Sequence, residues 1–203
     1  MTTPEMIARL LDVIEKDIAP KTRQGVAKGN KIFGAAILLK SDLSLVIAET
    51  NNETENPLWH GEMHAIKQLY ERDRASLPAP ADCIFLATHE PCSLCLSAIS
   101  WAGYDNFYYL FSHEQSRDSF AIPHDIHILK EVFQPPALQN TDAPLYNRRN
   151  AFWTGHDINA LVAGLDRGNK EALLGRLDDL AGLYADLSAA YQAQKGCAGI
   201  PLA

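Results

Sequence analysis

Cysteine is scarce in this sequence. Four occur in 203 residues, as Cys83, Cys92, Cys95 and Cys197. Small secreted domains that depend on disulfides carry a much denser set of cysteines. The sequence therefore gives no sign of a disulfide framework, and the closely spaced pair Cys92 and Cys95 needs another explanation.

Long apolar runs and an excess of positive charge are also missing. No stretch approaches the ~20 apolar residues that a membrane-spanning helix needs. Residues 1–5 lack the basic-then-apolar layout of a secretion signal, so we expect a cytoplasmic protein. Acidic residues outnumber basic ones by 25 to 18, giving a net charge of −7, which argues against nucleic acid as a partner. We expect a small-molecule substrate, with no nucleic acid and no membrane.

Two short motifs carry the chemistry that the sequence does contain. His60-Gly61-Glu62 reads H-x-E, and Pro91-Cys92-Ser93-Leu94-Cys95 reads P-C-x-x-C. Either motif alone has several uses, but the two together are typical of zinc-dependent nucleobase deaminases. We predict that His60, Cys92 and Cys95 bind one zinc ion whose fourth position holds water or hydroxide. Glu62 is then the proton carrier.

The spacing of these residues predicts where the metal lies. Cys92 and Cys95 share one helix face at i and i+3, and Pro91 suits the first position of that helix. His60 and Glu62 are two positions apart and diverge inside a helix. We therefore predict the metal at the N-terminal tip of a helix over 59–71.

Other interpretations of these residues remain open. The two cysteines alone suit a thioredoxin-like redox pair, which leaves His60 and Glu62 without a task. A structural zinc site needs a fourth protein ligand, for which Cys83 or Cys197 is available. His64, one helical turn after His60, is a less favoured ligand or neighbour of the metal.

Short apolar runs alternate with helical patterns up to about residue 133. The predicted strands are 32–39, 45–48, 83–88 and 107–111. The first predicted helix starts at Thr3-Pro4 and breaks at 17–20. The later predicted helices are 21–28, 59–71, the segment after Cys92, and 122–133. This alternation predicts an α/β fold, a three-layer α/β/α sandwich with the site at the strand ends.

Beyond residue 133 the pattern changes to a proline-containing loop and one long amphipathic helix. Asn169 is predicted to precede this helix. Its apolar stripe consists of Leu173, Leu177, Leu180, Tyr184, Leu187 and Tyr191. We divide the chain into a zinc-site domain, 1–133, and a helical C-terminal extension, 134–203, that packs on this domain or on a partner subunit.

The sequence resembles the cytidine/deoxycytidylate deaminase superfamily over residues 30–133, and within it most closely the guanine deaminases. The run from Glu90 to Ala102 carries the resemblance, including Ile99-Ser100-Trp101-Ala102 after the second cysteine. The resemblance implies a zinc hydrolase of nucleobase metabolism, such as purine catabolism. It also implies a mixed five-stranded sheet and commonly a homodimer.

Further residues follow from the resemblance. It implies that an asparagine before the zinc helix, Asn51 or Asn52, hydrogen-bonds the base, and that Asp125 contacts a purine. The alternatives are a turn asparagine and a helix N-cap. Family members usually have alanine where this chain has Gly61, a candidate pocket residue together with Phe33. Trp59 lies in a segment that also departs from the family, and it either stacks on a base or packs in the core. Phe33 either lines the pocket or packs in the core.

The sequence thus predicts a zinc-dependent hydrolase that converts the exocyclic amine of a free nucleobase, guanine-type, to a carbonyl and releases ammonia. Deamination of cytosine or cytidine is the alternative. A tRNA adenosine deaminase and a non-catalytic zinc scaffold fit less well, because the chain is acidic and because a scaffold has no need of Glu62.

Overall fold

A computed structural model describes residues 3–138 and 143–203 of the chain. A five-stranded sheet in the order β2-β1-β3-β4-β5 forms its centre. The strands are β1 (Gly34–Leu39), β2 (Leu45–Thr50), β3 (Cys83–His89), β4 (Asn106–Phe111) and β5 (Thr154–Asp157). β1 pairs antiparallel with β2 and β3, whereas β3, β4 and β5 run parallel to one another. The predicted mixed sheet is confirmed.

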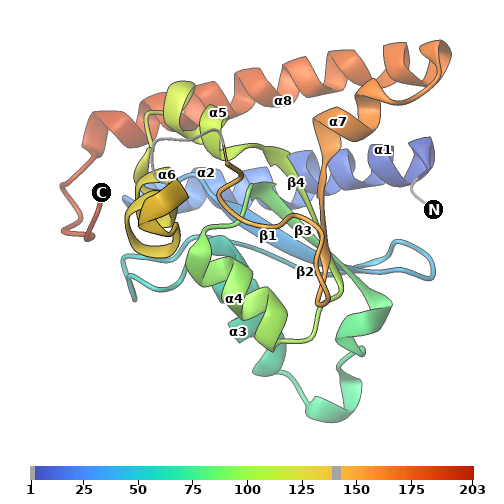
Figure 1. Cartoon of the computed structure of the whole chain (residues 1–203), viewed down its shortest axis with the longest axis horizontal. Helices are drawn as coiled ribbons and strands as arrows, with labels where there is room; N and C mark the ends of the chain where they lie inside the picture. Colours follow the sequence, from blue (N-terminus) through green and yellow to red (C-terminus); the bar gives the residue numbers. More distant parts are fainter. Residues whose placement is uncertain (1–2, 139–142) are drawn as a thin grey trace.

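Helices cover both faces of this sheet (Figure 1). The helices of one face are α1 (Pro4–Val13), α2 (Ala19–Ala27), α7 (Ile158–Ala163) and α8 (Arg167–Gln194), and those of the other are α3 (Gly61–Tyr70) and α4 (Ser93–Trp101). The short helices α5 (His113–Asp118) and α6 (His124–Ile128) lie at one end of the sheet, near the start of α4. The three-layer sandwich is therefore as predicted.

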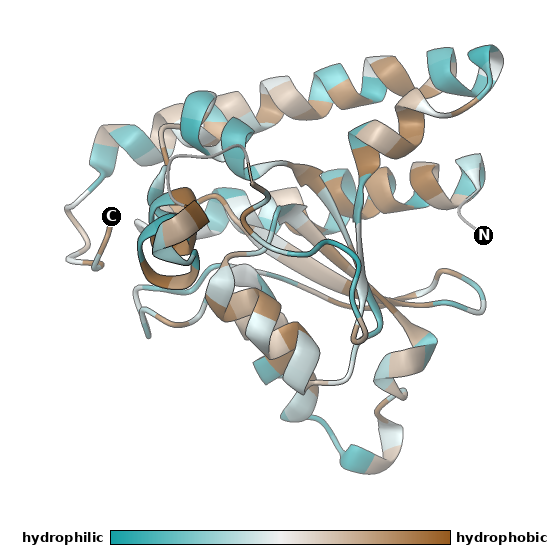
Figure 2. Ribbon diagram, viewed as in Figure 1, coloured by the Kyte–Doolittle hydropathy of each residue, from teal (hydrophilic) through white to brown (hydrophobic). Residues whose placement is uncertain are grey.

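Side chains of the strands alternate between two apolar cores. Ala36 and Leu38 of β1 pack with the α1 and α8 layer, and Ala35 and Ile37 pack with the α3 and α4 layer. A strand that is buried on both faces has no polar face, which explains why β1 is apolar throughout. Figure 2 shows the same apolar character along α1 and the central strands.

The N-terminal helices form one continuous helical segment, so the predicted break at 17–20 is wrong. Thr3 caps α1 as expected, with its side chain accepting from the amide of Met6. A π-helical turn, Ile14–Ile18, then joins α1 to α2. Pro20 falls in the first turn of α2, where a missing amide proton is tolerated. The change of hydrogen-bond pattern at the π turn lets the chain stay helical there.

The C-terminal region supplies the fifth strand, in a segment where a loop was predicted. β5 pairs with β4 from Asn106 opposite Thr154 to Tyr109 opposite Asp157. α8 begins earlier than predicted, because Asp166 is its N-cap and accepts from the amide of Asn169, which lies inside the helix. The predicted stripe of α8 is buried against this chain's own core.

The remaining helix predictions are close to the structure. The predicted helix 122–133 is α6 followed by a second π-helical turn, Leu129–Phe133. Single 3-10 turns occur at Arg74–Ser76, Pro80–Asp82 and Pro136–Leu138. None of the helices within the described ranges combines the length and the apolar character that crossing a bilayer requires.

Candidate active site

The predicted metal ligands lie at the starts of two helices on the same face of the sheet. His60 is the N-cap of α3, and Cys92 is the N-cap of α4, with Cys95 in the first turn. Pro91 therefore precedes the cap instead of occupying the first helical position. The strands β2 and β3 lead into these two helix starts, so the sheet fixes both tips relative to each other (Figure 1).

The three side chains converge on one point. Nδ1 of His60 lies 3.4 Å from Sγ of Cys92 and 3.8 Å from Sγ of Cys95. Tetrahedral zinc with ordinary Zn–N and Zn–S bond lengths places such a nitrogen and sulfur about 3.6 Å apart. The ligand atoms of these three residues all lie within 4.8 Å of one another. The spacing and the donor set fit one zinc ion.

The described residues do not supply a fourth protein ligand to this cluster. Cys83 is buried in the core between the sheet and α3, where its thiol faces the carbonyl of Ala79 at 3.4 Å. Cys197 is exposed near the end of the chain. His64 faces the carbonyl of Thr50 through Nδ1, at 2.9 Å, and is not part of the cluster. The arrangement leaves a coordination position for water, as catalytic zinc sites do.

The three ligands differ in how readily they lose a proton. A hydrogen bond from Cys95 and the contact with His60 hold the pKa of Cys92 well below its usual range. Burial raises the pKa of Cys95, and the negative charge of Cys92 adds to this effect. Burial disfavours the charged form of His60, but the hydrogen bond to Cys92 and nearby negative charges outweigh it and raise its pKa to about 9. Zinc therefore displaces protons when it binds.

Glu62 lies in the first turn of α3 and is buried, with 5% of its surface exposed. Burial, followed by the negative charge of Cys92, raises the pKa of Glu62 to about 7. A zinc ion adds positive charge beside it and acts in the opposite direction. A carboxyl group that titrates near neutral pH is suited to accepting and donating a proton.

The two candidate asparagines have different surroundings. Oδ1 of buried Asn51 accepts from the amide of Gly61 at 2.6 Å, and its Nδ2 donates to Glu53 at 2.9 Å. Asn52 instead donates from its side chain to Glu55 at 2.6 Å. Of the two, Asn51 is therefore the one attached to the start of the zinc helix.

Gly61 is in close contact with the backbone of Gly34. A Cβ atom on Gly61 would lie 2.6 Å from the Cα of Gly34. The alanine usual in the family therefore has no room at this position. The ring of Phe33 lies in the core, 4.6 Å from the ring of His89, although its backbone carbonyl accepts from the amide of Asn51 at 3.0 Å.

Asp125 and Trp59 lie at the edges of the site. Asp125 follows the first residue of α6, and burial, then the charge of Cys92, raises the pKa of its carboxyl group to about 6. His60 and Lys31 act in the opposite direction, so the structure brings Asp125 into the electrostatic surroundings of the ligands. Trp59 is half-buried, with the ammonium of Lys67 5.7 Å from its ring centroid.

A cluster that no sequence motif indicated holds the loop before Cys92. The side chain of Glu90 is fully buried and accepts from Nε of Arg148 at 2.9 Å and from the hydroxyl of Tyr146. It also accepts from the amide of His113 at 3.0 Å. His113 in turn contacts the carbonyl of Pro91 through Nε2, at 3.2 Å. We call this set the Glu90 clamp.

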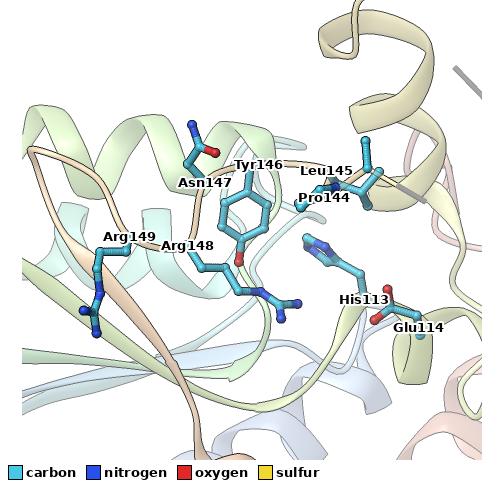
Figure 3. A pocket seen from close by; sticks show the side chains of 9 residues that line it. His113, Glu114, Pro144, Leu145, Tyr146, Asn147, Arg148 and Arg149 are labelled. Carbon is cyan, nitrogen blue, oxygen red and sulfur yellow. The ribbon is translucent and has the colours of Figure 1, made fainter. Parts of the chain in front are cut away.

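The segment 144–149 brings Tyr146 and Arg148 to this clamp. Figure 3 shows the side chain of Arg148 extending towards His113, with the hydroxyl of Tyr146 beside it, whereas Arg149 points away. A cavity of about 520 Å³ lies here, lined by His113, Glu114, Ala143, Pro144, Leu145, Tyr146, Asn147, Arg148 and Arg149. The C-terminal region therefore supports the cysteine loop directly.

Residues 13–111 match the family model of the cytidine and deoxycytidylate deaminase zinc-binding region. The matched segment, about half of the chain, contains the three ligands and Glu62. The chain belongs to the cytidine/deoxycytidylate deaminase superfamily, and its cofactor is one zinc ion at His60, Cys92 and Cys95.

Solved structures with a TM-score above 0.5 share this fold. The chain is similar to a guanine deaminase from Nitrosomonas europaea, with 18% identity and a TM-score of 0.52 over 93% of this chain and 86% of that one. A variant protein in complex with 8-azaguanine is 20% identical, with a TM-score of 0.53 over 95% and 85%. Guanine deaminase from Bacillus subtilis is 24% identical, with a TM-score of 0.49 over 74% and 88%. No curated protein sequence matches the chain.

Proposed function

We propose that this protein is a zinc-dependent hydrolytic deaminase of a free nucleobase, with a guanine-type base as the preferred substrate. The observation that carries the proposal is the buried carboxyl group of Glu62 beside the three metal ligands. A purely structural zinc site has no use for a buried proton carrier.

The residues of the site suit a deamination. Bound zinc supplies a water molecule whose pKa is lowered enough for it to act as a nucleophile. The oxygen of this water forms a bond to the ring carbon that carries the amine, while Glu62 takes the water proton and delivers it to the adjacent ring nitrogen. Glu62 then moves the proton of the new hydroxyl group to the exocyclic nitrogen, so that the carbon–nitrogen bond breaks, ammonia leaves and a carbonyl remains.

Asp125 and Asn51 support a purine as substrate. An ionised carboxylate accepts hydrogen bonds only, and guanine presents N–H donors at its ring and at its 2-amino group. Asn51 is attached to the first amide of α3, next to His60, and an amide Nδ2 carries a second proton beyond the one given to Glu53. We therefore favour Asn51 over Asn52 as the residue that contacts the base.

The other parts of the proposal rest on the sequence. The net charge of −7 supports a free base or nucleoside over tRNA. A homodimer, a cytoplasmic location and a domain boundary at residue 133 stay predictions.

The test is ammonia release by the zinc-loaded protein across a panel of free bases and nucleosides, with Glu62→Gln as the inactive variant. We expect guanine turnover that falls on the order of 10²–10⁴-fold in this variant while zinc content is unchanged. Glu55→Gln is the matched control, because Glu55 is exposed and accepts from the side chain of Asn52 in the same loop.

Each outcome of the panel has a definite meaning. Ammonia release from cytosine or cytidine but not from guanine would show that the substrate is a pyrimidine and not a purine. Release that is equal in the wild type and in Glu62→Gln would contradict the role of Glu62. No ammonia release from any compound of the panel, with zinc confirmed bound, would favour a non-catalytic zinc scaffold.

A further inference from the structure

A buried carboxylate lies behind the zinc ligand His60. The side chain of Glu53 is 1% exposed, and its Oε1 lies 2.6 Å from Nζ of Lys31, whose side chain is 8% exposed. Its Oε2 accepts from Nδ2 of Asn51 at 2.9 Å and from the backbone amide of Lys31 at 3.2 Å. Glu53 is therefore held at both oxygens.

The same carboxylate faces the far nitrogen of His60. Nδ1 of His60 faces the two cysteine sulfurs, whereas Nε2 lies 4.0 Å from Oε1 of Glu53. A histidine that gives Nδ1 to a metal must carry its ring proton on Nε2. At 4.0 Å the two atoms are too far apart for a hydrogen bond, so Glu53 acts on the ring proton through its negative charge.

We propose that Glu53 is a positioning residue for the zinc site: its carboxylate fixes the ring proton of His60 on Nε2 and strengthens Nδ1 as a ligand. Carboxylates in this place orient metal-bound histidines and raise their basicity. The ammonium of Lys31 contacts the buried carboxylate of Glu53, and Asn51 links Glu53 to the amide of Gly61, next to the ligand. The inference goes beyond the proposed deamination, because it concerns zinc affinity and not the substrate.

The first experiment measures zinc affinity by competition with a chelator, together with the visible absorption of the cobalt(II)-loaded protein. We expect Glu53→Gln to raise the dissociation constant for zinc by about 10–100-fold and to shift the cobalt bands. Glu55→Gln is the matched control: it changes the same residue type in the same loop, at an exposed position. It should leave both readouts unchanged.

A second set of variants separates positioning from plain stability. Lys31→Met removes the ammonium partner of Glu53 but keeps its hydrogen bonds from Asn51 and from the backbone amide of residue 31, so it should lower stability without weakening zinc binding. The double variant Lys31→Met/Glu53→Gln removes the buried charges together, so it should regain stability while zinc binding remains weak. The proposal is overturned if zinc affinity recovers with stability in the double variant. It is also overturned if Lys31→Met weakens zinc binding as much as Glu53→Gln does.

Discussion

Gly61 lies close to the backbone of Gly34 because Gly61 has no side chain. A Cβ on Gly61 would come within 2.6–2.9 Å of three backbone atoms of Gly34. Gly61→Ala should therefore destabilise the fold by about 1–3 kcal/mol, since backbone moves less readily than a side chain. Because His60 precedes this position, zinc binding should weaken as well.

Urea unfolding of zinc-loaded protein measures this effect. Gly182→Ala is the control, because a Cβ at Gly182, within α8, meets nothing within 4 Å. We expect it to stabilise the protein by about 0.5–1 kcal/mol, since alanine favours a helix. Equal midpoints for the two variants would contradict the proposed backbone contact.

His89 makes the stability of the protein depend on pH. Its ring packs among Phe33, Phe111, Phe120 and Tyr184. Burial lowers the pKa of His89 to about 3, whereas an unfolded histidine titrates near 6.5. Between these values the unfolded chain binds more protons, so the free energy of unfolding falls as pH falls. The slope from this residue is at most about 1.4 kcal/mol per pH unit.

Urea unfolding between pH 7 and pH 4 tests this dependence. His89→Phe keeps an aromatic ring but cannot take up a proton. Its free energy of unfolding should fall less steeply with acid than that of the wild type. Parallel slopes for the two proteins would show that His89 does not titrate as expected.

At the scale of single residues, the sequence predicts the metal ligands and Glu62, because zinc binding and proton transfer require these residue types at this spacing. It does not predict Glu53, Lys31 or Arg148. Lys31 and Glu53 are 22 positions apart, and Arg148 is 58 positions from Glu90. No short motif connects such pairs, and only the fold brings them together.

At the scale of elements, the segment 144–149 stabilises the loop that presents Cys92. Arg148→Met should lower the free energy of unfolding by about 1–3 kcal/mol, because the buried carboxylate of Glu90 loses a charged donor. The side chain of Arg148 is 52% exposed, so solvent partly screens this pair. Thermal or urea unfolding is the measurement.

Arg149→Met is the matched control for Arg148→Met. Arg149 lies next in the sequence, is exposed and points away from the clamp. It should change stability by less than about 0.5 kcal/mol. An Arg149 variant as unstable as the Arg148 variant would show that the segment, and not the Glu90 clamp, is sensitive to substitution.

Elements with a regular apolar pattern were predictable, and those without one were not. The stripe of α8 repeats at helical spacing, and β1, β3 and β4 are short apolar runs. β5 reads Thr-Gly-His-Asp, is half-buried throughout, and forms because β4 offers an unpaired edge. Pro20 indicated a helix break because proline usually ends a helix. The π-helical turn before it, which lets the helix continue, has no recognisable sequence pattern.

At the scale of the molecule, the zinc site depends on the C-terminal region for its sheet and its core. α8 buries Leu180, Tyr184 and Tyr191, each 2% exposed or less. A chain that ends at residue 133 lacks β5 and α8, so we expect it to lose cooperative unfolding and fixed aromatic packing. Near-ultraviolet circular dichroism and urea titration test this expectation. A fragment that unfolds cooperatively and binds zinc would instead support an independent domain ending at residue 133.

The order of synthesis gives the Glu90 clamp a further consequence. Ribosomes make the chain from the N-terminus, so His60, Cys92 and Cys95 are available to metal before Tyr146, Arg148 and β5 exist. At about 5–20 residues per second, roughly 3–12 seconds separate Cys95 from the end of β5. Zinc that binds during synthesis would meet a nascent chain whose β4 edge is still open, and the Glu90 clamp can form only after residue 148 has been made.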